Sequence, residues 1–351
     1  MKQFRNNVIR AGLGALYFSG AHYVLRPLFS GVGAIFMLHH VRPSRDAAFA
    51  PNRHLEVTPD FLRAMLEHLR SRDIDVVTID ELHQRLTTRN FSRRFACFTF
   101  DDGYRDNRDY ALAVMREFDA PFTVFVTSDF AEGSGLLWWI ALERVIAAAD
   151  TLNVTIGGTP AQLDTTTVAN KQAAFDRLHD WLRALPEFEL RRQMQALCAH
   201  HGVDQAAICG DLCMSWRELK EFAADPLVTI GAHSISHCNL ARQGEEVATF
   251  EMRESRARIE QALQIEVAHL AYPYGDRMAA GAREFAIARS AGYKTAVTTR
   301  PGMIFSENGG HLTALPRVSL NGNYQNERIL PVLTSGAATA MWNGFRRIDA
   351  A

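Results

Sequence analysis

Short, continuously apolar segments alternate with helical patterns along most of the chain, and this rhythm restricts the possible fold more than any other feature. Strands are predicted over residues 33–40, 75–79, 95–100, 121–127, 228–232, 267–271, 294–298 and 318–320. Helices are predicted from the cap Thr58 onward and over 106–118, 245–263 and 280–291. Strands that are apolar throughout, rather than alternating, are typical of parallel sheets covered by helices. About seven such units predict an α/β protein with an incomplete, distorted TIM-like (β/α)7-type barrel.

One long segment interrupts this rhythm between the fourth and fifth strands. Residues 131–214 show mostly helical patterns, over 138–149, 170–185 and 187–200. We therefore expect a barrel built from residues 31–130 and 215–322, an inserted helical subdomain over 131–214, and a helical C-terminal tail over 323–351. The loop after a barrel strand lies at the functional end of such barrels. The insertion is thus either one wall of a binding site or an additional packing layer.

The first 30 residues have an amphipathic pattern. Lys2, Arg5 and Arg10 precede a stretch of 15 mainly apolar residues from Ala11 to Leu25, which is closed by Arg26. A bilayer-spanning helix needs about 20 residues, so this stretch is too short. We expect an N-terminal amphipathic helix over 1–30 that is docked on the barrel or lies on a membrane surface. A cleaved secretory signal is the alternative, because residues 19–21 (Ser-Gly-Ala) resemble a signal-peptidase site.

Composition excludes several classes of protein. The 38 basic and 39 acidic residues give a formal net charge of −1, whereas a nucleic-acid-binding protein needs a basic excess or stripe. We therefore expect no nucleic-acid partner. The 47% apolar content excludes a disordered chain. Five cysteines do not suggest a disulfide framework, and Cys209 and Cys213 lack a second ligand pair, so reduced thiols are expected rather than a structural zinc site.

Three chemically rich segments directly follow predicted strands. They are Thr99–Gly103 (TFDDG), His233–His237 (HSISH) and Tyr272–Gly275 (YPYG). Each alone has an ordinary interpretation, as a helix cap, a chance histidine pair or a turn. Because the carboxyl ends of parallel strands converge on one mouth, the carboxylate pair and the histidine pair are expected to meet there.

The residue types suit metal-assisted chemistry. Two imidazoles and one carboxylate make a three-ligand site whose open positions hold a water and a substrate oxygen. A neighbouring carboxylate can then accept a proton from that water. Gly103 lets the chain turn sharply, so the adjacent carboxylates Asp101 and Asp102 can face different partners.

These segments resemble the motifs of the NodB-homology polysaccharide deacetylases, carbohydrate esterase family 4. Thr99–Gly103 matches the first motif of the family, His233–His237 matches the second, and Pro273–Gly275 matches the end of the third. The resemblance spans about residues 34–130 and 215–320. The insertion at 131–214 is not part of the common core.

The resemblance implies a role for each matching residue. Asp101 would be the catalytic base. Asp102, His233 and His237 would hold a divalent metal ion, with zinc expected and cobalt or nickel as alternatives. The main-chain N–H of Tyr274, which follows Pro273 in the third motif, would help to bind the oxyanion.

Other site residues follow less directly. His39 stands where many members carry a strand-end histidine, and it is a candidate for supporting the site or contacting substrate. The arginine that usually opens the third motif is Ala271 here. Either another arginine reaches the mouth to orient the base and keep it ionised, or the base works without one. Arg317 is the candidate for this role, with Arg105 as its rival. A structural ion pair is the ordinary interpretation of Arg317.

The general acid is the least defined role. The late histidine His311 is the candidate, and a solvated loop residue is its ordinary interpretation.

We therefore expect a metal-dependent hydrolase that removes N-acetyl groups from amino-sugar oligo- or polysaccharides, of the chitooligosaccharide or exopolysaccharide type, and releases acetate. One alternative is a deacylase or deformylase of a lipid-linked amino sugar at a membrane surface. The other is an inactive carbohydrate-binding relative. The expected location is the cytoplasm, with peripheral membrane contact through residues 1–30, and a secreted or periplasmic location is the alternative.

Overall fold

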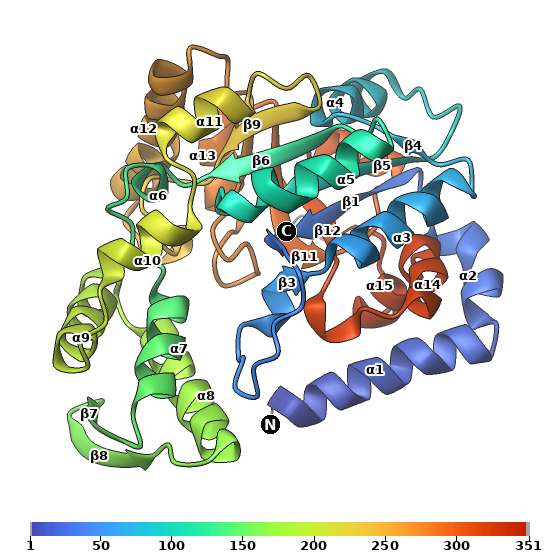
Figure 1. Ribbon diagram of the computed structural model, residues 1–351. Helices are drawn as coiled ribbons and strands as arrows, with labels where there is room; N and C mark the ends of the chain where they lie inside the picture. Colours follow the sequence, from blue (N-terminus) through green and yellow to red (C-terminus); the bar gives the residue numbers. More distant parts are fainter. Residues whose placement is uncertain (1, 349–351) are drawn as a thin grey trace.

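Seven parallel strands form a closed ring at the centre of the protein (Figure 1). The structure is a computed structural model that describes residues 2–348. Around the ring the strands follow the order β1, β12, β11, β10, β9, β6 and β5, and pairing of β5 with β1 closes it. They are β1 (Gly33–Leu38), β5 (Phe95–Phe100), β6 (Phe122–Val126), β9 (Val228–Ala232), β10 (His269–Ala271), β11 (Thr295–Pro301) and β12 (Leu315–Ser319). The predicted (β/α)7-type barrel is confirmed, and it is incomplete in having seven strands rather than eight.

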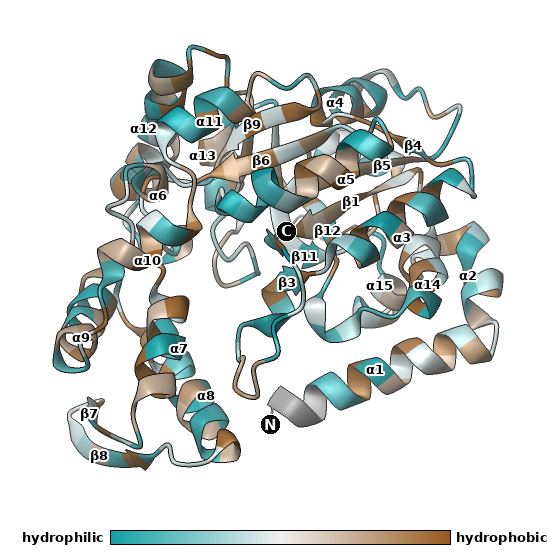
Figure 2. Cartoon of the chain, in the orientation of Figure 1, coloured by the Kyte–Doolittle hydropathy of each residue, from teal (hydrophilic) through white to brown (hydrophobic). Residues whose placement is uncertain are grey.

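Helices surround the ring and cover its outer side, while side chains of the strands themselves fill its interior. They are α3 (Pro59–Arg70), α4 (Ile79–Thr88), α5 (Leu112–Glu117), α6 (Ser128–Ala131), α11 (Trp216–Phe222), α12 (Glu245–Leu263) and α13 (Ala282–Ser290). Every residue of β1, β5 and β6 is buried. Figure 2 shows apolar colouring on the central strands and more polar colouring on the outer helix faces. Burial on both faces is the reason that these strands are apolar throughout.

Local signals account for some boundaries and not for others. The Thr58 hydroxyl accepts the Phe61 N–H and caps α3, as the sequence predicts. The strand predicted over 75–79 is wrong in its second half, because β4 (Asp75–Val76) is short and pairs with β5 outside the ring. Thr78 instead caps α4 by accepting the Glu81 N–H. The remaining short elements are β2 (His40–Val41), β3 (Glu56–Val57), a π-turn (Asn107–Ala111) and 3₁₀ turns at Arg53–Leu55, Leu240–Arg242, Ser306–Gly310, Gly322–Tyr324 and Glu327–Ile329.

The insertion after β6 has its own apolar core. It contains α7 (Trp138–Ala148), α8 (Val168–Ala184), α9 (Glu187–His200) and α10 (Gln205–Leu212). The sequence predicts a helical subdomain here, and this prediction is incomplete. The insertion also contains an antiparallel hairpin of β7 (Thr151–Ile156) and β8 (Thr159–Asp164). The two-residue turn is Gly157–Gly158, with φ of 58° and 84°. A Gly-Gly pair between two short strands is the usual signal for such a turn.

The two ends of the chain pack together on the side of the barrel. The single helix predicted over 1–30 is two helices, α1 (Lys2–Phe18) and α2 (Ala21–Phe29), separated at Gly20 with φ of 71°. Leu13 and Leu16 of α1 pack against α14 (Leu330–Ser335) and α15 (Ala337–Trp342). Docking on the domain is thus confirmed, and the predicted helical tail is helical to residue 342. Residues 1 and 349–351 of these predicted segments lie outside the described residues.

No helix within residues 2–348 is both long enough and apolar enough to cross a membrane.

Candidate active site

Asp102, His233 and His237 meet at the carboxyl end of the barrel. The Oδ1 atom of Asp102 lies 3.5 Å from Nε2 of His233 and 3.4 Å from Nε2 of His237. All three side chains are buried, and one ligand atom of each lies within 4.8 Å of the others. Among residues 2–348 this is the one such group able to hold a metal ion. The predicted convergence of the first two motifs is therefore confirmed.

The chemistry of this group fits a divalent cation. The Nδ1 atom of His233 lies 2.7 Å from the Ala271 carbonyl oxygen, so it carries the proton and leaves the Nε2 lone pair facing Asp102. The buried Oδ1 of Asp102 has no hydrogen-bond partner among the described residues. Burial and the charge of Asp101 raise the pKa of Asp102 to about 8. A cation between these atoms would satisfy the carboxylate, and three protein ligands would leave open positions.

The loop that carries the two histidines is held in a strained conformation. Ser234 and His237 have φ of 62° and 57°, in the left-handed region that costs energy for non-glycine residues. Glu251 of α12 holds this loop, because its carboxylate accepts the N–H groups of Ile235 and Ser236 at 2.9 and 3.0 Å. Sequence reasoning missed Glu251, which lies inside an ordinary helical pattern with no local sign of this contact.

Asp101 is paired with Arg317. The two carboxylate oxygens of Asp101 accept hydrogen bonds from Nη1 and Nη2 of Arg317, both at 2.7 Å, and both side chains are buried. Burial alone would raise the pKa of Asp101, but the Arg317 charge and its hydrogen bonds hold that pKa well below the ordinary value. The Nε of Arg317 donates to the Thr298 carbonyl oxygen at 2.8 Å, which fixes the guanidinium plane. The third motif has Ala271 in place of the usual arginine. Arg317 of β12 supplies the positive charge beside Asp101 instead.

His311 does not reach this mouth. It is exposed and precedes β12, and the next residue, Leu312, accepts a hydrogen bond from the N–H of Ala296 near the start of β11. His311 therefore lies at the amino ends of the strands, opposite Asp102, and the predicted general-acid role is wrong. A residue that precedes a parallel strand is at the wrong end of the barrel to meet residues that follow one.

Arg105 is also directed elsewhere. Its Nε donates to Glu218 of α11 at 2.9 Å, which leaves Arg317 as the partner of Asp101.

His39 follows β1 and lies at the mouth, as predicted. Its Nε2 is 4.0 Å from Oδ2 of Asp101, and its side chain is 20% exposed. The adjacent His40 is directed away, since its Nδ1 lies 2.7 Å from Oδ2 of Asp106 and its ring stacks on Tyr104. His39 is therefore the histidine beside the base that substrate can reach.

Residues of the insertion line the same mouth. The indole Nε1 of Trp138 donates to the Tyr274 hydroxyl at 2.8 Å. The rings of Trp139 and Tyr274 each lie 5.0 Å from the His237 ring. These contacts favour the insertion as a wall of the site. Trp138 and Trp139 are nearly fully buried, so they shape the mouth rather than offer an open stacking surface.

Tyr274 stands in the turn predicted for it. Its φ is 59°, and the N–H of Gly275 donates to the Pro273 carbonyl oxygen at 2.7 Å. The oxyanion-binding role of the Tyr274 N–H stays a prediction.

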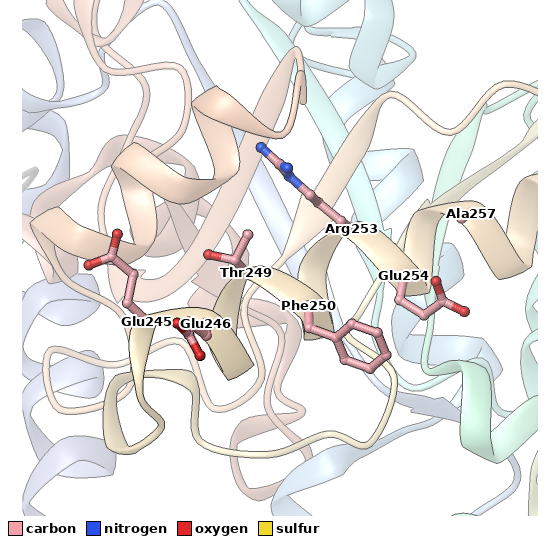
Figure 3. A pocket seen from close by; sticks show the side chains of 7 residues that line it. All are labelled: Glu245, Glu246, Thr249, Phe250, Arg253, Glu254 and Ala257. Atoms are coloured by element: carbon pink, nitrogen blue, oxygen red, sulfur yellow. The ribbon is translucent and has the colours of Figure 1, made fainter.

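Two further features of the described residues lie outside the Asp–His–His group. A pocket lies along α12 (Figure 3). It is lined by Glu245, Glu246, Thr249, Phe250, Arg253, Glu254 and Ala257. All five cysteines are free and buried, as expected for reduced thiols.

A closed seven-strand parallel barrel with these strand-end motifs defines a carbohydrate deacetylase of the NodB-homology class. The chain belongs to the polysaccharide deacetylase family, whose profile matches residues 88–296, more than half of the sequence. It is accordingly a deacetylase hydrolase.

Solved structures share the fold at low sequence identity. The Streptococcus pyogenes deacetylase PplD in complex with acetate is 18% identical, with 83% of this chain and 92% of that chain covered and a TM-score of 0.54. IcaB from Ammonifex degensii is 17% identical, with coverage of 87% and 96% and a TM-score of 0.52. A de-N-acetylase from Aggregatibacter actinomycetemcomitans is 9% identical, with coverage of 82% and 94% and a TM-score of 0.51. A comparison with curated proteins finds no significant match.

Proposed function

We propose that the protein is a metal-dependent N-deacetylase that hydrolyses the N-acetyl groups of amino-sugar oligo- or polysaccharides and releases acetate. One observation carries this proposal: an ionised base, Asp101, stands beside a buried Asp–His–His group whose carboxylate oxygen lacks a partner among the described residues. The similarity to a deacetylase in complex with acetate and to a de-N-acetylase supports the acetyl group as the one removed.

Asp102, His233 and His237 would hold the metal ion. A divalent ion there would supply Lewis acidity, which polarises the acetamide carbonyl and makes water a better nucleophile. Zinc is the proposed ion, because a carboxylate and two imidazoles suit it, and cobalt or nickel would also fit this ligand set.

Asp101 acts as the general base. Each of its oxygens has two lone pairs, and the bidentate contact with Arg317 uses only one on each. The remaining lone pairs can accept the proton of the attacking water. Because Arg317 holds the pKa of Asp101 well below its ordinary value, the pair favours the ionised carboxylate.

The leaving amine needs a proton, and His39 is the proposed donor. Burial lowers the pKa of its imidazole to about 3, so the neutral ring must first take up the proton that Asp101 accepts from the attacking water. His39 lies 4.0 Å from Asp101 and is partly exposed at the mouth, whereas His311 is at the opposite end of the barrel. The main-chain N–H of Tyr274 would bind the oxyanion.

The proposal is tested by acetate release from chitooligosaccharides, poly-N-acetylglucosamine and peptidoglycan. Chelated protein should be inactive and should recover with Zn²⁺, Co²⁺ or Ni²⁺. The variant His233→Ala/His237→Ala should lose both metal and activity, and the distant variant His311→Ala is the matched control. Metal retained at full stoichiometry by the double variant would contradict the assigned ligands.

A lipid-linked amino sugar is the second candidate substrate, with an acyl or formyl group removed. The exposed apolar side chains of α1 and α2 favour it, because they would bring the enzyme to a bilayer. Adding N-acyl and N-formyl lipid-linked sugars to the substrate panel distinguishes the two. A preference for the lipid-linked forms over soluble oligosaccharides would replace the first proposal.

A further inference from the structure

Helices α1 and α2 turn an apolar face away from the barrel. Val8, Phe18, Tyr23, Val24 and Leu28 are all more than half exposed, with Phe18 at 74% and Val24 at 76%. The opposite side of α1 is the packed one, since Leu13 and Leu16 are buried against α14 and α15. Figure 1 shows α1 along one edge of the molecule. Helix α1 is therefore apolar on both its packed side and its outer side.

The C-terminal segment extends this face. Met341, Trp342 and Phe345 are also more than half exposed. Phe345 lies 5.6 Å from Phe29 of α2 between ring centroids, and Arg347 donates to the Leu28 carbonyl oxygen at 2.9 Å. Residues 345–347 thus lie against the end of α2. The exposed apolar side chains of α1, α2 and residues 341–345 are together called here the apolar N-terminal face.

Basic residues outnumber acidic ones beside this face, where Glu327 is an exposed acidic neighbour of Arg328. The sequence contains four basic residues and no acidic residue over 1–30. The guanidinium of Arg328 lies 5.7 Å from the centre of the Phe18 ring. A second copy of the chain would bring like charges together, whereas an anionic surface would be attracted.

A basic pocket opens beside Tyr23. Three arginines and two histidines line it, and none of its described lining residues is acidic: His22, Tyr23, Arg26, His68, Arg72, Ile74, Arg94, Pro331, Thr334 and Ser335. The Nε2 of His22 is buried without a hydrogen-bond partner among the described residues. Burial, together with the charge of Arg26, lowers the pKa of Arg94 to about 10. The cavity itself has a volume of only about 10 Å³, enough for about one water molecule, so these basic side chains would attract a phosphate-type anion to its rim.

We propose that the apolar N-terminal face docks the protein on an anionic lipid bilayer, with α1 and α2 in the interface and the basic pocket facing a lipid phosphate. Interfacial helices of this kind combine a buried apolar side with basic neighbours. Trp342 and Tyr23 belong to the residue types that concentrate at membrane–water interfaces. The proposal is independent of which glycan the enzyme deacetylates.

The direct test is co-sedimentation of the full-length protein with vesicles of phosphatidylcholine, alone or mixed with phosphatidylglycerol. Binding should require the anionic lipid and weaken as salt is added. The variant Phe18→Asp/Val24→Asp should bind at least about tenfold more weakly. Its matched control is Phe188→Asp/Phe250→Asp, which changes equally exposed aromatic residues on α9 and α12. Acetate release from a soluble substrate should be unchanged in both variants, which shows that they are folded.

A second pair of variants tests the basic pocket. Arg26→Gln/Arg72→Gln should reduce binding to the mixed vesicles and flatten its salt dependence, and the control Arg192→Gln/Arg253→Gln should do neither.

Three results would overturn the proposal. One is the absence of binding to mixed vesicles at low salt, including the case in which inorganic phosphate binds but vesicles do not. Another is an equal loss of binding in the control variants. The third is a protein that does not bind vesicles and forms a dimer in solution, which Phe18→Asp/Val24→Asp converts to a monomer. That result would show that the face binds a second copy of the chain.

Discussion

Removal of Arg317 tests how the base is kept ionised. In Arg317→Ala, Asp101 loses two charge-assisted hydrogen bonds of 2.7 Å inside a pair that is about 1% exposed. Breaking a buried pair by deleting one partner costs about 3–5 kcal/mol, because the other charge stays buried without compensation. We therefore expect a loss of unfolding free energy of that size near pH 7.

The pH dependence has a definite sign. In the wild type the pKa of Asp101 is depressed, so the pair stabilises the fold above the unfolded pKa of about 3.9. This contribution is lost as pH falls through the folded pKa. In the variant, burial is the largest remaining influence on Asp101, and burial raises the pKa. The gap in unfolding free energy between wild type and variant should therefore begin to narrow as the pH falls through the raised pKa of the variant, above about 4, and should continue to narrow towards the depressed pKa of the wild type.

Catalysis should respond in the same direction. The acidic limb of kcat/KM should move to higher pH in Arg317→Ala, and turnover should fall roughly ten- to hundredfold with the metal retained. Arg317→Lys should recover only part of the activity, because lysine lacks the planar fork. Urea unfolding, pH–rate profiles and metal analysis measure these effects.

Two further variants make the reasoning refutable. Arg105→Ala removes a partly exposed pair with Glu218, so it should cost at most about 1 kcal/mol and leave the acidic limb in place. Asp101→Asn/Arg317→Ala should be more stable than Arg317→Ala alone, because it removes the uncompensated charge. An unchanged acidic limb with normal turnover in Arg317→Ala would refute the supporting role of this arginine.

Three other predictions concern the remaining roles. Asp101→Asn should keep the metal and lower turnover by roughly 10² or more, whereas Asp102→Asn should lose metal; exchanged phenotypes would exchange the two roles. His39→Gln should lower turnover with the metal retained, and His311→Gln should leave turnover unchanged. Lower turnover in His311→Gln alone would mean that His39 is not the proton donor. Glu251→Gln should weaken metal affinity roughly 10- to 100-fold by loosening the histidine loop, and unchanged affinity in a metal titration would reduce Glu251 to a packing role.

Much of the barrel was predictable because its signals are local. The strands β5 and β9 have the predicted bounds, since a strand buried on both sides is a short apolar run that ends where polar residues begin. The motifs placed Asp101, Asp102 and the two histidines at strand ends, and parallel geometry brought those ends together.

The sequence by itself therefore determined the class of fold and the candidate metal-ligand set. Tertiary structure decided which cation pairs with Asp101, because Arg317 is 216 positions from Asp101 and no periodicity relates them. It also decided that His311 does not reach the mouth and that Glu251 holds the histidine loop. Each of these contacts joins different elements, and only the closed ring of strands fixes their distances.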